Sequence, residues 1–127
     1  MKRTTIHDLL AAARERITRL TPDEALEAQT QGAQIVDTRD SEDRAREGVI
    51  PGSIHAPLSV LPWRVDPTAE FTDNRLNDQA TRLIIVCNDG YSSSLAAAML
   101  VDVGFENAAD LRGGFRAWSA GGLPVDR

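Results

Sequence analysis

Apolar residues in this chain follow two alternating patterns, one typical of helices and one typical of strands. Residues 5–16 carry apolar side chains three and four positions apart, which predicts an amphipathic helix. A second helix is expected to begin after Thr21, which forms a capping box with Glu24, and to end at Gly32. The alanine-rich residues 93–103 predict a further helix.

Short apolar runs between these helices predict the strands. Strands are expected at residues 17–20, 33–38, 83–86 and 108–111, with a short extended piece at 54–56. Residues 41–47 are charged and weakly helical, and residues 113–118 predict a final helical turn. Residues 57–80 contain three prolines and are expected to hold no long element. Strands alternating with helices predict an α/β fold with a small, mostly parallel sheet.

Composition narrows the class of protein. A length of 127 residues predicts one domain, which we divide into a helical extension, residues 1–16, and a domain over residues 17–127. The net charge of −5 argues against nucleic acid as a partner. There is no apolar run long enough for a membrane span, and residues 1–8 do not resemble a secretory signal. A single cysteine and two distant histidines predict no internal disulfide, metal or cofactor, and favour a cytoplasmic location.

The single cysteine, Cys87, lies at the end of the most apolar run. A polar loop, residues 88–93, follows it and leads into the alanine-rich helix. Backbone N–H groups of such a loop and the N-terminus of the helix stabilise an anion, so the pKa of the thiol is expected to fall. The sequence therefore predicts a catalytic thiolate at Cys87, although a buried and inert cysteine is the alternative. The expected substrate-binding loop comprises Asn88, Asp89, Gly90, Tyr91, Ser92 and Ser93.

The loop residues have individual expected roles. Gly90 permits a positive φ or a close approach, and Ser93 is expected to cap the following helix. Tyr91 is expected to be exposed. Asp37 and Arg39 follow another strand at the carboxyl edge of the sheet, where α/β sites lie. We interpret them as a structural ion pair that supports the loops rather than as catalytic groups.

Four separated motifs resemble the rhodanese-like sulfurtransferase family, over roughly residues 17–125. They are Ile35-Val36-Asp37-Thr38-Arg39, Gly48-Val49-Ile50-Pro51-Gly52-Ser53-Ile54, Cys87-Asn88-Asp89-Gly90-Tyr91-Ser92-Ser93, and Gly104-Phe105 followed by Leu111-Arg112-Gly113-Gly114-Phe115-Arg116-Ala117-Trp118. They are similar to the family's Asp-x-Arg strand, its Gly-His-Ile-Pro-Gly-Ala turn, its active loop and its Gly-Gly-x-x-x-Trp ending. Two positions depart from the pattern, because Val49 replaces the usual histidine and Ser92 replaces an arginine found in many members.

The resemblance implies a small parallel sheet with helices on both faces. It also implies that Cys87 takes a sulfane sulfur from a donor such as thiosulfate and passes it to cyanide or a thiol. A sulfur-carrier protein or a cysteine desulfurase is a further partner that such a domain would have. The sequence leaves the natural donor and acceptor open.

Two other functions remain as alternatives. One is a binding, regulatory or redox-sensing domain that keeps the fold but has little activity. The other is a cysteine phosphatase, which is disfavoured because its Cys-x5-Arg loop needs an arginine where this chain has Ser93.

Overall fold

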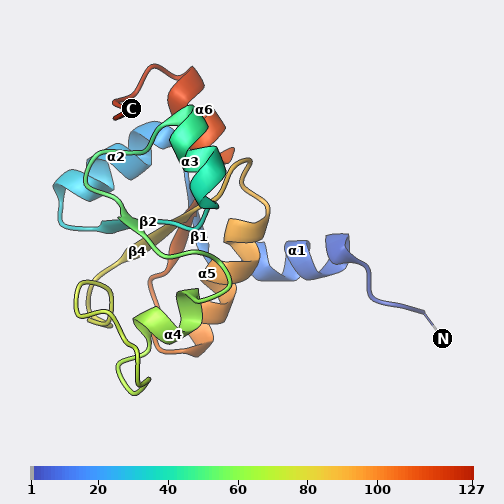
Figure 1. Ribbon diagram of the computed structural model, residues 1–127. Helices are drawn as coiled ribbons and strands as arrows, with labels where there is room; N and C mark the ends of the chain where they lie inside the picture. Colours follow the sequence, from blue (N-terminus) through green and yellow to red (C-terminus); the bar gives the residue numbers. More distant parts are fainter. Residues whose placement is uncertain (1) are drawn as a thin grey trace.

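A parallel sheet with strand order β1-β5-β4-β2-β3 forms the centre of the computed structural model, which describes residues 2–127 (Figure 1). Its strands are β1 (Thr18–Leu20), β2 (Gln34–Asp37), β3 (Ile54–His55), β4 (Leu83–Val86) and β5 (Ala109–Leu111). The helices are α1 (Ile6–Glu15), α2 (Pro22–Thr30), α3 (Ser41–Glu47), α4 (Leu61–Val65), α5 (Ser92–Asp102) and α6 (Gly114–Ala120). The predicted fold class is confirmed, and every strand pair in this sheet is parallel.

Helices cover both faces of the sheet, because the side chains of its central strands alternate between two apolar cores. Leu83 and Ile85 of β4 point into one core, which they share with residues of α4 and α5. Ile84 and Val86 point into the other, which contains residues of α2 and α6. Trp118 of α6 is fully buried there. Because the strands are parallel, the carboxyl ends of β2, β3 and β4 lie at the same edge of the sheet, between the two helical layers.

Local sequence signals explain where the N-terminal helices begin. Thr5 caps α1 through a reciprocal capping box with Asp8, and Thr21 caps α2 in the same way with Glu24. The helix predicted over residues 5–16 is confirmed, with α1 packed beside α5. In Figure 1 α1 extends outward from α5 toward the N-terminus.

Residues 57–80 hold no long element, as predicted, and contain only the five-residue helix α4. Pro62 lies in its first turn, where a missing N–H costs no helical hydrogen bond. Several element boundaries differ from the sequence-based predictions by one or two residues. The helix predicted to begin at residue 93 begins one residue earlier, at Ser92. The predicted final turn continues two residues beyond Trp118, to Ala120.

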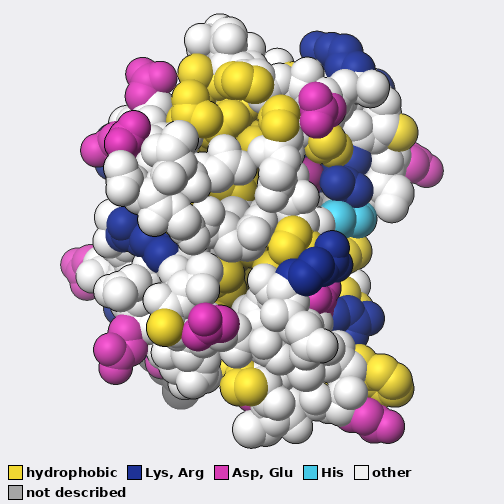
Figure 2. Space-filling model, turned by 90° about the vertical axis from the view of Figure 1, so that its left-hand side faces the viewer, with side chains coloured by type: hydrophobic (Ala, Val, Ile, Leu, Met, Phe, Trp, Pro, Cys, Tyr) yellow, Lys and Arg dark blue, Asp and Glu magenta, His cyan; other side chains and the backbone are white. Residues whose placement is uncertain are grey.

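The surface agrees with the composition. On the face shown in Figure 2, acidic and basic side chains are interspersed, and hydrophobic side chains gather toward the top. Among residues 2–127, no helix combines the length and hydropathy that crossing a membrane requires.

Candidate active site

Cys87 is placed by the strand before it. All four residues of β4 are buried, so the strand is fixed between both cores and delivers Cys87 to the carboxyl edge of the sheet. The chain then turns through Gly90, whose φ of +88° lies in the left-handed region that favours glycine. A β-carbon at Gly90 would also lie 2.7 Å from the backbone nitrogen of Gly113. The glycine predicted to permit a tight loop is thus required both by its dihedral angle and by the space around it.

Two backbone groups of the loop point at the sulfur. The N–H of Gly90 donates to Sγ of Cys87 at 3.2 Å, and the N–H of Ser93 donates at 3.4 Å. Burial raises the pKa of the Cys87 thiol, but hydrogen bonds from Ser93, Ser92 and Gly90 outweigh burial and bring the pKa below its ordinary value. The hydroxyl of Ser93 has only one proton, which it donates to a carboxylate oxygen of Asp110, 2.8 Å from Oγ. The backbone N–H groups of Gly90 and Ser93 are therefore the donors that bond to the sulfur.

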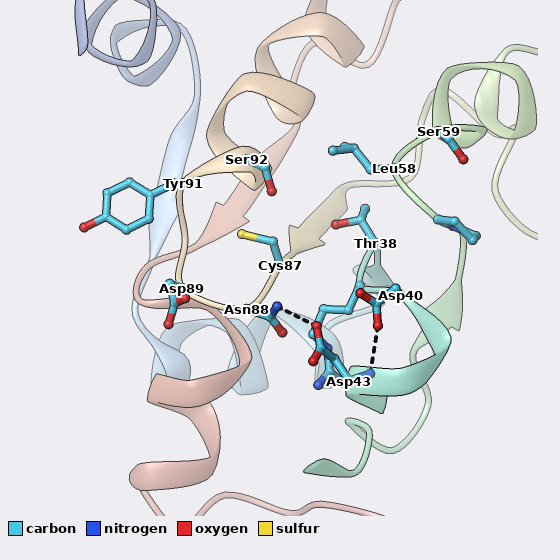
Figure 3. Close-up of a pocket in the computed structure, with 12 residues that line it drawn as sticks. Thr38, Asp40, Asp43, Leu58, Ser59, Cys87, Asn88, Asp89, Tyr91 and Ser92 are labelled. Atoms are coloured by element: carbon cyan, nitrogen blue, oxygen red, sulfur yellow. Dashed lines mark hydrogen bonds between the residues drawn. The ribbon is translucent and has the colours of Figure 1, made fainter. Parts of the chain in front are cut away.

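The sulfur lies at the floor of an open pocket of about 530 Å³ (Figure 3). Three strand ends supply its walls, and the lining residues are Thr38, Arg39, Asp40, Asp43, Pro57, Leu58, Ser59, Cys87, Asn88, Asp89, Tyr91 and Ser92. Cys87 is 7% exposed, so a small ligand in the pocket reaches a largely desolvated sulfur. The hydroxyl of Ser92 points toward the sulfur, whereas the Tyr91 ring points away from it (Figure 3).

The pocket rim is acidic. Asp40, Asp43 and Asp89 all line the pocket. Asn88 donates to Asp43 at 2.9 Å, and this bond lowers the pKa of that carboxyl below its usual value, so Asp43 is ionised at neutral pH. Asp89 accepts a hydrogen bond from Arg116. The predicted loop residues Asn88 and Asp89 thus shape the rim through side-chain contacts, while Gly90 and Ser93 contact the sulfur.

Asp37 and Arg39 form the ion pair that their sequence positions suggest. Arg39 donates to both carboxylate oxygens of Asp37, at 3.1 and 2.9 Å, and both residues are buried. Arg44 joins the pair with a 3.1 Å bond to Asp37. His55 lies 2.7 Å from the carbonyl oxygen of Arg39 and is not among the residues that line the pocket. This cluster holds the loop after β2, and the structure gives no contact between it and Sγ of Cys87.

One expected role is wrong. Ser93 does not cap α5, because the helix begins at Ser92 and its N-cap position is occupied by Tyr91. The Ser93 side chain is fully buried and bonds to Asp110 instead. A neighbouring hydroxyl, that of Ser94, donates to the same carboxylate at 2.7 Å. Only tertiary structure reveals this preference, since Asp110 is distant in sequence.

Sequence reasoning also missed a group of charged residues behind the loop. Arg14 and Arg19 both donate to the carbonyl oxygen of Gly90, at 2.8 and 2.9 Å. Arg19 also bonds to Asp110, which is fully buried in β5. The one local signal was an aspartate inside an otherwise apolar strand, residues 108–111. Among residues 2–127, no three His, Cys, Asp or Glu side chains are grouped to hold a metal ion.

Comparison with known proteins gives consistent matches. The model of the rhodanese-like domain matches residues 21–121. A thiosulfate sulfurtransferase GlpE of Pseudomonas entomophila is 37% identical over 100 residues, covering 79% of this chain and 83% of that protein. A sulfurtransferase of Allochromatium vinosum is 31% identical over 98 residues, covering 77% and 82%.

A solved structure extends the likeness to the N-terminal helix. It is a Rhodopseudomonas palustris protein of unknown function, described as a possible tyrosine phosphatase, with 30% identity and a TM-score of 0.89. The match covers 99% of both chains, so it includes α1 and β1, which precede the residues matched by the domain model.

Proposed function

The chain belongs to the family of rhodanese-like domains, and from this membership and the geometry around Cys87 we propose that it is a sulfurtransferase that carries sulfur on Cys87. Relatives of about a third identity that are named sulfurtransferases support this activity. The observation that carries the proposal is the pair of N–H groups, from Gly90 and Ser93, aimed at a sulfur on the floor of an open pocket. A thiolate held in this way needs no separate general base.

The reaction has two displacements. The Cys87 thiolate attacks the sulfane sulfur of thiosulfate or of a persulfide donor, and the sulfur–sulfur bond within the donor breaks. Sulfite, or the donor's thiolate, leaves with the electron pair, and Cys87 becomes a persulfide. A thiol or cyanide acceptor then attacks the outer sulfur, and the Cys87 thiolate leaves and is restored.

Mass spectrometry of the intact protein tests this proposal. After incubation with thiosulfate, wild-type protein should gain the mass of one sulfur atom on Cys87, and cyanide should remove it with release of thiocyanate. Cys87→Ala should do neither. Equal inactivity of wild type and Cys87→Ala with thiosulfate and with a small-molecule persulfide would refute the proposal.

Two further assays, thiol alkylation and aryl phosphate hydrolysis, separate the alternatives. A redox-sensing or regulatory domain would give no thiocyanate and a thiol of ordinary reactivity. A phosphatase would hydrolyse a generic aryl phosphate, but its loop needs an arginine to clamp the phosphoryl group. Here the sixth residue after Cys87 is Ser93, whose side chain is bonded to Asp110. We therefore propose sulfurtransferase activity in preference to phosphatase activity.

A further inference from the structure

The carbonyl oxygen of Gly90 accepts hydrogen bonds from two guanidinium groups. Arg14 reaches it from α1 at 2.8 Å, and Arg19 reaches it from β1 at 2.9 Å. Arg14 also donates to Oγ of Ser94 at 3.1 Å and lies over the Tyr91 ring, with its guanidinium carbon 5.6 Å from the ring centroid. Both arginines are partly buried, so these charge-assisted bonds are less exposed to water than a surface pair.

These bonds fix the direction of a peptide group. The residues described contain no cis peptide bond, and in a trans peptide the C=O and the next N–H point in opposite directions. With the Gly90 carbonyl held from behind by the arginines, the N–H of Tyr91 is directed to the opposite side. Within residues 2–127, neither this N–H nor that of Ser92 donates to another group of the chain. Both are free to bind the outer sulfur or the oxygen atoms of a donor.

A buried carboxylate allows two cations to share one carbonyl. Asp110 accepts from Arg19 at 3.0 and 3.3 Å and from the hydroxyls of Ser93 and Ser94 at 2.8 and 2.7 Å. Its negative charge offsets the repulsion between the guanidinium groups. The hydroxyl bonds tie the first turn of α5 to the same cluster.

We propose that Arg14 and Arg19 are positioning residues for Cys87: they hold the Gly90–Tyr91 peptide so that its N–H faces the pocket, and they supply the positive charge that the loop itself lacks. This inference rests on the proposed sulfur transfer. Both residues precede residue 21, where the matched domain begins, and residues 88–93 of the loop contain no lysine or arginine. The cations therefore come from the helix and strand that precede the matched domain.

Other charges also face the site and must be considered in any pH profile. Arg39, Asp40, Asp43 and Asp89 line the pocket. Asp110 lies behind the loop with Arg14 and Arg19. Removal of one arginine leaves the four pocket-lining charges unchanged, so a shift in thiol reactivity then reports on the group behind the loop.

The test replaces Arg14, which is only partly buried, and uses as its control Arg16, the C-cap residue of the same helix, α1. Arg14→Gln and Arg14→Lys both lose the planar fork that reaches Gly90 and Ser94 together. Arg16→Gln is the control, because Arg16 pairs with exposed Asp102 and has no contact with the loop. The measurements are the pH dependence of Cys87 alkylation by iodoacetamide, sulfur transfer from thiosulfate to cyanide, and thermal unfolding.

We expect Arg14→Gln to remain folded, to alkylate about threefold to tenfold more slowly at pH 7 and to reach its plateau at a higher pH. The kcat/KM of sulfur transfer should fall about tenfold. Arg14→Lys should lower the alkylation rate and kcat/KM in the same direction. Arg16→Gln should match wild type in both measurements. Folded Arg14→Gln and Arg14→Lys proteins with wild-type alkylation profiles would overturn the inference. Because alkylation needs no sulfur donor, this result is independent of whether the wild type transfers sulfur.

Discussion

The backbone N–H of Phe115 donates a 2.8 Å hydrogen bond to the carbonyl oxygen of Cys87. The next N–H, that of Arg116, donates to the carbonyl of Asn88 at 3.1 Å. The first N–H groups of a helix have no partner within it, so two of those in α6 donate to the loop that carries Cys87. Gly114 permits this contact, because a β-carbon there would lie 2.5 Å from the carbonyl oxygen of Asn88. Gly113-Gly114 therefore supports the Cys87 loop in addition to forming a turn.

Alkylation of Cys87 should begin at a lower pH in the folded protein than in the unfolded chain. The loop's hydrogen bonds bring the pKa of the thiol below its ordinary value despite burial, and only the thiolate reacts. The rate should rise with pH, and the pH at which it reaches half of its plateau should lie below that of the unfolded chain. The same protein in denaturant is the control, and a half-point as high as in denaturant would contradict the prediction.

The same shift predicts a pH dependence of stability. Because the folded-state pKa of Cys87 is lowered, ionisation stabilises the fold fully above the unfolded-state pKa, and this contribution is lost as the pH falls through the folded-state value. The difference in unfolding free energy between wild type and Cys87→Ala should therefore grow with pH over this window. Chemical denaturation at several pH values measures it, and a constant difference would count against an ionised sulfur.

Replacement of Gly90 by alanine should damage both stability and activity. The positive φ costs about 1–3 kcal/mol, and the new β-carbon would meet Gly113. Gly122→Ala is a matched control, because Gly122 has a φ of +77° but nothing within 4 Å of its β-carbon position. We expect both variants to lower the free energy of unfolding, but only Gly90→Ala to slow alkylation and sulfur transfer. Equal activities of the two variants would show that the loop tolerates the displacement.

Asp110→Asn should destabilise the fold by about 3 kcal/mol, because it removes the counter-charge of Arg19 and weakens the bonds from two buried hydroxyls. Asp102→Asn removes an exposed partner of Arg16 and should leave stability unchanged. Denaturant unfolding of both variants measures the contrast. If Asp110→Asn unfolds at the wild-type denaturant concentration, the carboxylate is not essential to the cluster.

Ser92→Arg should strengthen the binding of an anionic donor. The pocket rim carries three carboxylates, and Ser92 faces the sulfur. A guanidinium there should lower the KM for thiosulfate about tenfold, which corresponds to one charge-assisted bond of about 1.5 kcal/mol. Ser92→Gln is the uncharged control and should leave the KM near that of wild type. An unchanged KM in Ser92→Arg would indicate that the cations behind the loop already suffice.

The sequence predicts the elements and the nucleophile because their signals are local. The run of residues 83–86 is too apolar and too short for anything but a central strand, and Cys87 with Gly90 follows it directly. The capping boxes at Thr5 and Thr21 depend only on neighbouring residues. Such features give the sheet, the loop and the position of the sulfur without tertiary information.

The supports of the site could not be predicted in this way. Arg14 and Gly90 are 76 positions apart, and no periodicity links them. Serine is a common helix cap because its hydroxyl oxygen accepts from a backbone N–H, but the hydroxyl of Ser93 donates to the buried carboxylate of Asp110 instead. The fold alone brings these partners together.

Arg19 and Asp110 are also direct partners in the ladder between β1 and β5. If β1 slipped by one residue, its side chains would exchange faces, and Asp110 would lie in the interior without its cation. The ion pair thus helps to fix the register of β1, a strand only three residues long. The ion pair behind Cys87 therefore also disfavours misaligned pairing of β1 with β5.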